Sequence, residues 1–168
     1  DMRKIRKKRK LLIRLVCDAK DMKEDAGSLH QQIKLWIPTA KFKDKTGDFY
    51  QTVVIGDVII DVKTHSQDIV SHAGPDYDLV IFNEPAPKAI YEENISRLRK
   101  GGRAALFLTP LSGASYLRDD VIRPEGPEGE VYFTEGNVWE NCKDIEGTRG
   151  ILAKSDIEFQ IRKWKRLG

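Results

Sequence analysis

One short stretch, DLVIFNEPAP (Asp78–Pro87), constrains the fold more than any other part of this sequence. Four consecutive apolar residues, Leu79 to Phe82, run directly into Asn83 and Glu84 and then into two prolines. An uninterrupted apolar run of this length is typical of a strand that is buried on both faces, as in a parallel sheet. A second run, RAALFLTP, has the same form and ends at Thr109. Asn83, Glu84 and Thr109 should therefore lie at the carboxyl ends of buried strands, where open α/β sheets bind ligands.

The rest of the chain alternates between strand and helix patterns. The expected strands are LLIRLVC, FYQTVVI, VIIDVKT, DLVIFN, RAALFLTP and VYFTEG, and the expected helices are SLHQQIKLWIP, PKAIYEENISRLRKGG, SGASYLRDDVI and the C-terminal GILAKSDIEFQIRKWKRLG. Ser28 is a suitable N-cap for the first helix and Pro38 should end it. Residues 18–25 and the stretch KFKDKTGD are predicted to be polar loops. Gly56-Asp57 joins two β-rich runs and predicts a hairpin. This order predicts an α/β fold: a mostly parallel sheet with helices on both faces and one hairpin excursion.

Length and composition fit one soluble domain. The chain has 168 residues, of which 40% are hydrophobic and 33% charged. We expect a domain over residues 11–168 that follows a basic segment over residues 1–10. That segment holds seven basic residues and one acidic residue, whereas the remaining chain is net negative. The basic side chains are candidates for phosphate contacts, although a solvated terminal tail is the competing interpretation. They are Arg3, Lys4, Arg6, Lys7, Lys8, Arg9 and Lys10.

Cysteine and histidine usage indicates a reducing compartment and no structural zinc. Cys17 and Cys142 are too few for a disulfide framework, and three scattered histidines without a C-x-x-C motif do not predict a zinc site. No apolar run is long enough to cross a bilayer, and no signal peptide is visible. We therefore expect an intracellular protein without a membrane partner.

The segment from THSQDIVSHAGP to TPLSGASYL resembles the ATPase core of viral and phage terminase large subunits, which are DNA-packaging motors with a P-loop NTPase-like fold. The resemblance covers roughly residues 11–168 and rests on the order and spacing of short motifs. The matching pieces are Thr64 and Gln67, Gly74, Leu79–Pro85, Arg97, Gly102-Arg103, Thr109-Pro110-Leu111-Ser112-Gly113, VYFTEGNVWEN, and the closing helix over Ile157–Gly168.

The resemblance implies roles for particular residues. Glu84 would be the catalytic carboxylate that orients the attacking water, and Asn83 would occupy the Walker B magnesium position. Thr109 would belong to the motif that senses the nucleotide. The implied cofactors are ATP and Mg²⁺. The implied partners are double-stranded DNA, a portal, a small terminase subunit and further copies in a homo-oligomeric ring, in the cytoplasm of the host cell. Arg97, Arg99 and Arg103 are candidates to face phosphate or DNA, with a solvated helix face as the alternative for each.

Two departures from the family pattern limit this interpretation. Asn83 keeps a carbonyl ligand for Mg²⁺ but lacks the negative charge of the usual Asp. No G-x-x-x-x-G-K-[ST] phosphate-binding loop occurs anywhere in the sequence, and the family's C-terminal nuclease is also missing. We therefore expect a fragment of a terminase ATPase domain that is a weak or inactive ATPase on its own.

Three alternatives stay open at this point. A helicase or recombination ATPase fragment would share the strand ends, but 168 residues leave no room for a second similar domain. A non-catalytic nucleic-acid-binding or assembly module would explain Asn83, the missing loop and the basic start. A small-molecule α/β enzyme is the weakest alternative, because no G-x-S-x-G motif, glycine fingerprint or Cys/His pairing is present.

Overall fold

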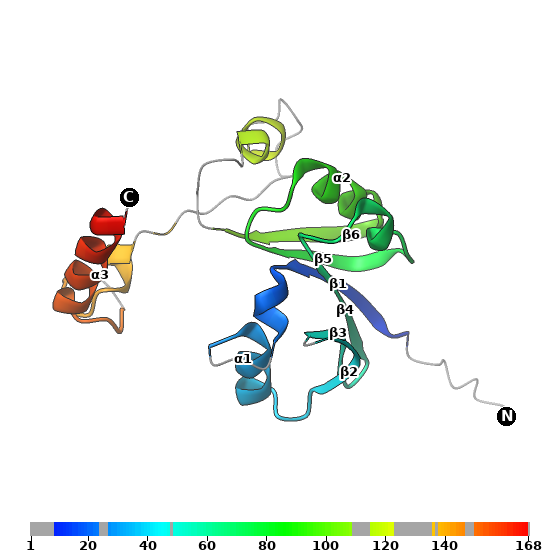
Figure 1. Ribbon diagram of the computed structural model, residues 1–168, viewed down its shortest axis with the longest axis horizontal. Coiled ribbons are helices and arrows are strands. Elements are labelled where there is room, and N and C mark those ends of the chain that lie inside the picture. The colour runs from blue at the N-terminus through cyan, green and yellow to red at the C-terminus, as the bar shows by residue number, and fades with distance from the viewer. Residues whose placement is uncertain are drawn as a thin grey trace, which may run out of the picture. The chain divides into compact units, whose positions relative to one another are not determined.

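The structure is a computed structural model that describes residues 9–23, 27–47, 49–108, 115–122, 136, 138–146 and 150–167. It divides into two compact units, residues 1–119 and 120–168. The prediction that residues 11–168 form a single domain stays a prediction. Within the described part of the first unit lies a six-stranded sheet of order β2-β3-β4-β1-β5-β6 (Figure 1). Its strands are β1 Leu11–Cys17, β2 Lys41–Thr46, β3 Phe49–Ile55, β4 Val58–Thr64, β5 Tyr77–Asn83 and β6 Leu98–Phe107.

The central strands are parallel, as the sequence predicts. β1 pairs in parallel with β4 on one side and β5 on the other, and β5 pairs in parallel with β6. β3 is antiparallel to β4, and β2 is antiparallel to β3. The 3₁₀ helix η1 (Ala19–Met22) and helix α1 (Leu29–Trp36) lie on one face, and α2 (Lys88–Ser96) lies on the other (Figure 1). The predicted α/β fold with helices on both faces is confirmed.

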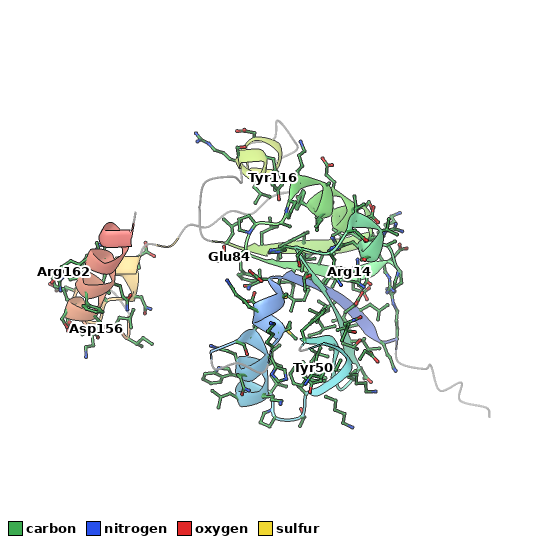
Figure 2. All side chains as sticks on the ribbon, viewed as in Figure 1. Arg14, Tyr50, Glu84, Tyr116, Asp156 and Arg162 are labelled. Carbon is green, nitrogen blue, oxygen red and sulfur yellow. The ribbon has the colours of Figure 1, made fainter. Side chains whose placement is uncertain are left out.

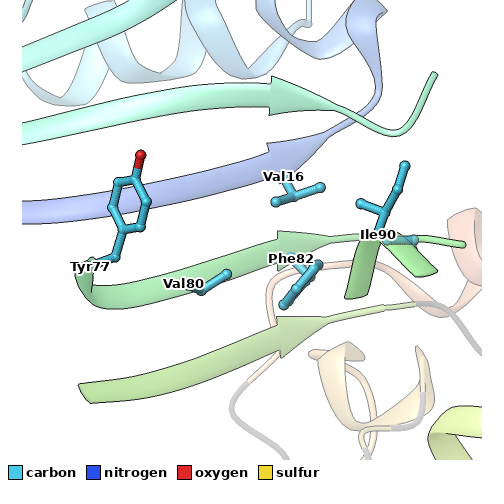
Figure 3. Close-up of a cluster of buried hydrophobic side chains, with 6 residues drawn as sticks. Val16, Tyr77, Val80, Phe82 and Ile90 are labelled. Carbon is cyan, nitrogen blue, oxygen red and sulfur yellow. The ribbon is translucent and has the colours of Figure 1, made fainter. Parts of the chain in front are cut away.

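Two apolar clusters, one on each face, hold these layers together. On the α2 face, Val16, Val80 and Phe82 pack with Ile90 (Figure 3). On the α1 face, another cluster contains Leu15, Cys17, Met22, Val53 and Val62, with Leu29 and Ile33 of α1 packed against it. Consecutive side chains of β1 thus enter opposite clusters, which requires the continuous apolar run seen in its sequence. Full burial of each large apolar side chain stabilises the fold by about 1.5–3 kcal/mol.

The hairpin between β3 and β4 forms where the sequence predicts it. Ile55 pairs with Val58 across the turn. Gly56 has a φ of 57°, in the left-handed region that a side chain with a Cβ atom disfavours. The N-cap prediction is also confirmed, since the Ser28 hydroxyl accepts a hydrogen bond of 3.2 Å from the Gln31 backbone N–H.

Three element predictions need correction. The predicted loop over residues 18–25 includes η1. Residues Lys41–Thr46 of the predicted polar loop KFKDKTGD form β2, because Phe42 packs against the α1-face cluster and the backbone pairs with β3. The helix expected to reach Gly101-Gly102 ends at Ser96, and β6 begins at Leu98, so the two glycines lie inside a strand. Gly101 there has a φ of 79°, and the pairing with β5 shifts register in this part of the strand.

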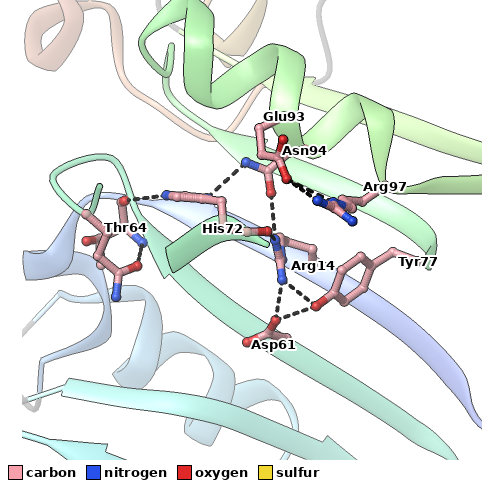
Figure 4. Close-up of polar contacts among 9 residues, drawn as sticks. Arg14, Asp61, Thr64, His72, Tyr77, Glu93, Asn94 and Arg97 are labelled. Carbon is pink, nitrogen blue, oxygen red and sulfur yellow. Dashed lines mark hydrogen bonds and ion pairs between the residues drawn. The ribbon is translucent and has the colours of Figure 1, made fainter. Parts of the chain in front are cut away.

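A buried arginine organises the polar interior of the first unit (Figure 4). Arg14 of β1 is fully buried and donates to the carbonyl oxygen of His72, to Tyr77 Oη, to Asp61 Oδ2 at 2.7 Å and to Asn94 Oδ1 at 3.1 Å. These groups belong to β4, β5, α2 and the 3₁₀ helix η2 (Ile69–His72). One cation therefore connects five elements, and an ion pair with the carboxylate of Asp61 compensates its burial.

The described part of the second unit is small. It contains the 3₁₀ helix η4 (Val138–Asn141) and the helix α3 (Lys154–Leu167), where Ile157 is buried. Cys142 and Leu152 form an isolated parallel bridge, and Asp144 Oδ2 accepts a 2.8 Å hydrogen bond from the Lys154 N–H at the start of α3. A π-helical segment, η3 (Leu117–Ile122), precedes these elements in the chain. The predicted strand VYFTEG lies outside the described residues except for its last glycine, Gly136. None of the helices in the described ranges is long and apolar enough to span a bilayer.

Candidate functional site

The candidate site lies where β1, β4 and β5 end. Because these strands are parallel, the residues that follow them meet at one edge of the sheet: Asp18 after β1, His65 after β4, and Asn83 with Glu84 at the end of β5. After β1 the chain builds β4 on one side of it and then β5 on the other side. Such a reversal of strand order is the place where open α/β sheets bind ligands.

A hydrogen bond joins the ends of β1 and β5. The Asn83 side chain donates from Nδ2 to Asp21 Oδ2 at 2.9 Å. The same Asp21 oxygen accepts the Asp18 backbone N–H at 3.2 Å, as part of the capping box of η1. Asp21 therefore provides, next to Asn83, the negative charge that the asparagine lacks. No sequence signal points to this contact, since Asp21 and Asn83 are 62 positions apart.

Glu84 is held in an unusual backbone conformation. Its φ is 68°, in the left-handed region, which costs a residue other than glycine about 1–2 kcal/mol. The Glu84 backbone N–H donates to the carbonyl oxygen of Phe107 at 2.8 Å and thereby ties the end of β5 to the end of β6. Figure 2 shows Glu84 at this end of the sheet. Strained residues of this kind concentrate at functional sites, so Glu84 is the best-supported member of the predicted set.

His65 is a further member of the site that the sequence did not indicate. Its backbone N–H donates to the Cys17 carbonyl oxygen at 3.0 Å. The Nε2 atom is buried and has no hydrogen-bond partner among the described residues. Burial lowers the pKa of His65, while the nearby charges of Asp18, Asp21 and Glu84 act in the opposite direction. The site therefore holds an imidazole among three carboxylates.

Cys17 is not a nucleophile at this site. Burial, with smaller contributions from the charges of Asp21 and Asp18, raises the pKa of its thiol to about 12. The thiol is then protonated at neutral pH, and thiolate chemistry is excluded there. Asp18 differs, because the backbone N–H of Lys20 lowers the pKa of its carboxyl and keeps it ionised.

Of the other predicted site residues, the structure describes only Arg9 and Lys10, and neither joins this cluster. Thr109 and the basic residues from Arg3 to Lys8 lie outside the described residues. Arg9 pairs with Asp78 at 2.6 Å, near the start of β5, and Lys10 is exposed. Asp78 and Asn83 are five residues apart in one strand, so Arg9 binds about 16 Å from the site.

The three arginines named with the family resemblance have separate positions. Arg97 forms an ion pair with Glu93 at 2.6 Å, and Arg99 forms one with Asp78 at 3.0 Å. Arg103 lies on β6 and is exposed. Arg97 and Arg99 are thus engaged with carboxylates of the same unit.

The residues of this site could supply some of the ligands of a magnesium ion. They do not form a binding site for the phosphates of a nucleotide. Among the described residues no group of three His, Cys, Asp or Glu side chains could hold a metal ion. Mg²⁺ commonly binds one or two carboxylates and keeps several waters, and Asp21 with the carbonyl of Asn83 could supply such a partial set. A triphosphate needs a loop of backbone N–H groups with a lysine, and the sequence contains no such loop.

Comparison with known proteins identifies a structural likeness only. No family model and no curated protein matches the sequence. The chain is similar to a solved structure of the large terminase from a thermophilic bacteriophage, with a TM-score of 0.50, 12% identity, and coverage of 69% of this chain and 30% of that chain. The same terminase in complex with ADP aligns with a TM-score of 0.43 and 13% identity over 61% of this chain and 26% of that one. The chain spans less than a third of the terminase, and at this identity the likeness shows the fold alone.

Proposed function

We propose that this chain is part of the ATP-hydrolysing motor domain of a terminase large subunit, which drives viral DNA into a procapsid. One observation carries the proposal: Asn83 and Glu84 end a central parallel strand, with Glu84 in a strained conformation and Asn83 joined to Asp21. The fold likeness at a TM-score of 0.50 supports it. The proposal includes ATP and Mg²⁺ as cofactors, and double-stranded DNA, a portal, a small terminase subunit and a homo-oligomeric ring as partners, in the host cytoplasm.

Each residue of the site would have a distinct task. The Glu84 carboxylate would accept a hydrogen bond from the attacking water and orient it, as a general base does. Asn83 would offer its carbonyl oxygen to the hydrated magnesium ion, with Asp21 supplying negative charge beside it. The nucleotide phosphates would be held by a loop outside these 168 residues, because the sequence contains none.

A non-catalytic assembly module is the second candidate. The observation in its favour is that the Asn83 amide is already engaged by Asp21, in a chain without a phosphate-binding loop. In such a module, the contact between Asn83 and Asp21 would fasten β5 to η1 and have no catalytic task.

The coding sequence upstream of Asp1 provides the first test. The proposal expects an in-frame G-x-x-x-x-G-K-[ST] within roughly 30–60 residues, the length of a strand–loop–helix unit. ATP hydrolysis by the encoded protein should then fall about 10²-fold or more in Glu84→Gln, because a general base contributes that much. Glu92→Gln, an exposed carboxylate on α2, is the matched control and should keep full activity. If the upstream loop is missing and no hydrolysis is measurable, the assembly module is the better assignment.

A further inference from the structure

A basic surface with exposed apolar side chains lies away from the candidate site, at the edge of the sheet formed by β2. We define the lysine surface as Lys34, Leu35, Trp36, Lys41, Lys43 and Lys45. Between Lys34 and Thr46 the chain holds four lysines and one aspartate, Asp44. All four lysines are exposed, and within the described part of the chain Lys41 and Lys43 form no ion pair. The surface therefore has a net positive charge.

Two of these lysines lie over a pair of neighbouring aromatic rings. The Lys34 ammonium lies 5.7 Å above the ring of Phe42, and the Lys45 ammonium lies 5.3 Å above the ring of Tyr50, which Figure 2 labels. The two rings are 5.5 Å apart. Lys41 and Lys43 flank Phe42 on β2, which is an edge strand. Lys41, Lys43 and Lys45 thus occupy alternate positions along this edge strand, whose Phe42 packs inward.

Trp36 is the unexpected member of this surface. Leu29, Ile33, Trp36 and Ile37 recur at helical spacing, which is typical of the core-facing side of a helix. Leu29 and Ile33 do pack against the core, but Trp36 is 77% exposed and Leu35 is 72% exposed. α1 ends at Trp36 and β2 begins at Lys41, so the connection is only four residues long and the Cα atoms of Trp36 and Lys41 are at most about 18 Å apart.

We propose that the lysine surface binds single-stranded nucleic acid, with the lysines contacting phosphates and Trp36 stacking on a base. Proteins that bind single strands without sequence preference combine a positive track for the backbone with aromatic side chains for the bases. The exposed Trp36 and the exposed lysines of β2 supply these two components. A duplex keeps its bases stacked inside, so it offers phosphates to the lysines but no free base face to Trp36.

Protection of the edge strand against pairing with other sheets explains the lysines of this surface but not its exposed apolar side chains. Lysines on an edge strand discourage pairing with other sheets, and Lys41, Lys43 and Lys45 fit that purpose. The large exposed side chains of Trp36 and Leu35 do not help to prevent such pairing. The exposed Trp36 is the observation that favours a partner, and the lysines indicate that the partner is a polyanion.

The test measures binding of the whole chain to a labelled single-stranded oligothymidine and to a duplex of equal length. Trp36→Ala should weaken single-strand binding about tenfold, the effect of one stacked base, while Trp36→Phe should keep most of it. Lys41→Glu with Lys43→Glu should lower the slope of log affinity against log salt by about 1.4. The controls are Val70→Ala, which is equally exposed at 77%, and Lys88→Glu with Lys100→Glu on α2 and β6. Circular dichroism should show that every variant is folded.

Three results would overturn the inference. Equal losses in the lysine-surface and control variants would assign the binding to general charge. Tighter binding to the duplex, with no effect of Trp36→Ala, would remove the stacking contact. A dimer in sedimentation that Trp36→Ala abolishes would make the surface an interface between copies. The measurement involves no nucleotide hydrolysis, so its failure is separate from a failure of the proposed ATPase.

Discussion

The side chain of Arg14 can only donate hydrogen bonds. Its contacts therefore determine which ring nitrogen of the buried His72 carries the proton. Arg14 donates to Asn94 Oδ1, which leaves Asn94 Nδ2 to donate to His72 Nδ1 at 2.9 Å. His72 must therefore carry its proton on Nε2, which donates to the Thr64 carbonyl at 3.3 Å. A second proton, on His72 Nδ1, would point at the N–H group of Asn94, so the charged form of the ring is disfavoured. The chain of contacts ends at Thr64, directly before His65 of the candidate site, so the buried network positions the end of β4.

The stability of the first unit should therefore depend on pH through His72. Burial lowers the pKa of His72 below its usual 6.5, the charges of Arg14 and Lys63 lower it further, and Asp68 is the acidic group nearby. As the pH falls through 6.5 the unfolded chain binds a proton that the folded chain does not, so the free energy of unfolding should decrease. Urea unfolding at about pH 8 and about pH 5.5 measures this change.

His72→Gln is the variant that tests the assignment. Glutamine offers one donor and one acceptor and does not titrate, so the variant should lose part of the pH dependence. His65, whose pKa burial also lowers, would account for the remainder. An unchanged pH dependence in His72→Gln would show that His72 is not the responsible group.

Asn83 offers a residue-scale test of the metal assignment. Asn83→Asp replaces the amide that donates to Asp21 at 2.9 Å with a second carboxylate. Without divalent ions, the lost hydrogen bond and the repulsion should destabilise the fold by about 1–3 kcal/mol. Mg²⁺ should then raise the melting temperature of Asn83→Asp more than that of the unchanged protein. Asn83→Ala is the matched control, because it removes the hydrogen bond without adding charge. If Mg²⁺ affects both variants equally, the pair Asp21 and Asn83 holds no metal.

At the scale of elements, the apolar runs of the sequence predicted the described strands whose side chains face the core. This signal failed for β2, because the lysines of KFKDKT point to solvent and only Phe42 packs inward. It also failed where Gly101-Gly102 suggested a helix stop, since pairing with β5 overrides the local preference of glycine. The strand ends in the site were predictable because Asn83 and Glu84 adjoin an apolar run. Asp21 and His65 were not, because only the folded sheet brings them to that edge.

The hairpin turn is the element whose sequence signal can be tested most directly. Gly56→Ala should destabilise the first unit by about 1 kcal/mol, because a Cβ atom disfavours the φ of 57°. No atom lies within 4 Å of the position that this Cβ would take, so a steric clash is not the cause. Gly56→Asn should cost less, since asparagine tolerates left-handed backbone better. Urea unfolding of both variants measures the difference, and equal losses would contradict the role assigned to backbone conformation.

At the scale of the whole molecule, the described residues of both apolar clusters belong to the first unit. Both apolar clusters and every partner of Arg14 lie within residues 1–119, the unit that the chain contacts define. The candidate site and the lysine surface also belong to this unit. A unit that has its own hydrophobic core can in principle fold alone.

We therefore expect a chain that ends at Asp119 to fold by itself. Trp36 is its only tryptophan, since the other two, Trp139 and Trp164, lie in the second unit, so its fluorescence reports on the first unit alone. Urea should unfold this shortened chain in one cooperative transition. The full chain should show the same transition when only Trp36 is retained, in a Trp139→Phe and Trp164→Phe background. If the shortened chain has no cooperative transition, residues 120–168 contribute to folding of the first unit, and the two units are not independent.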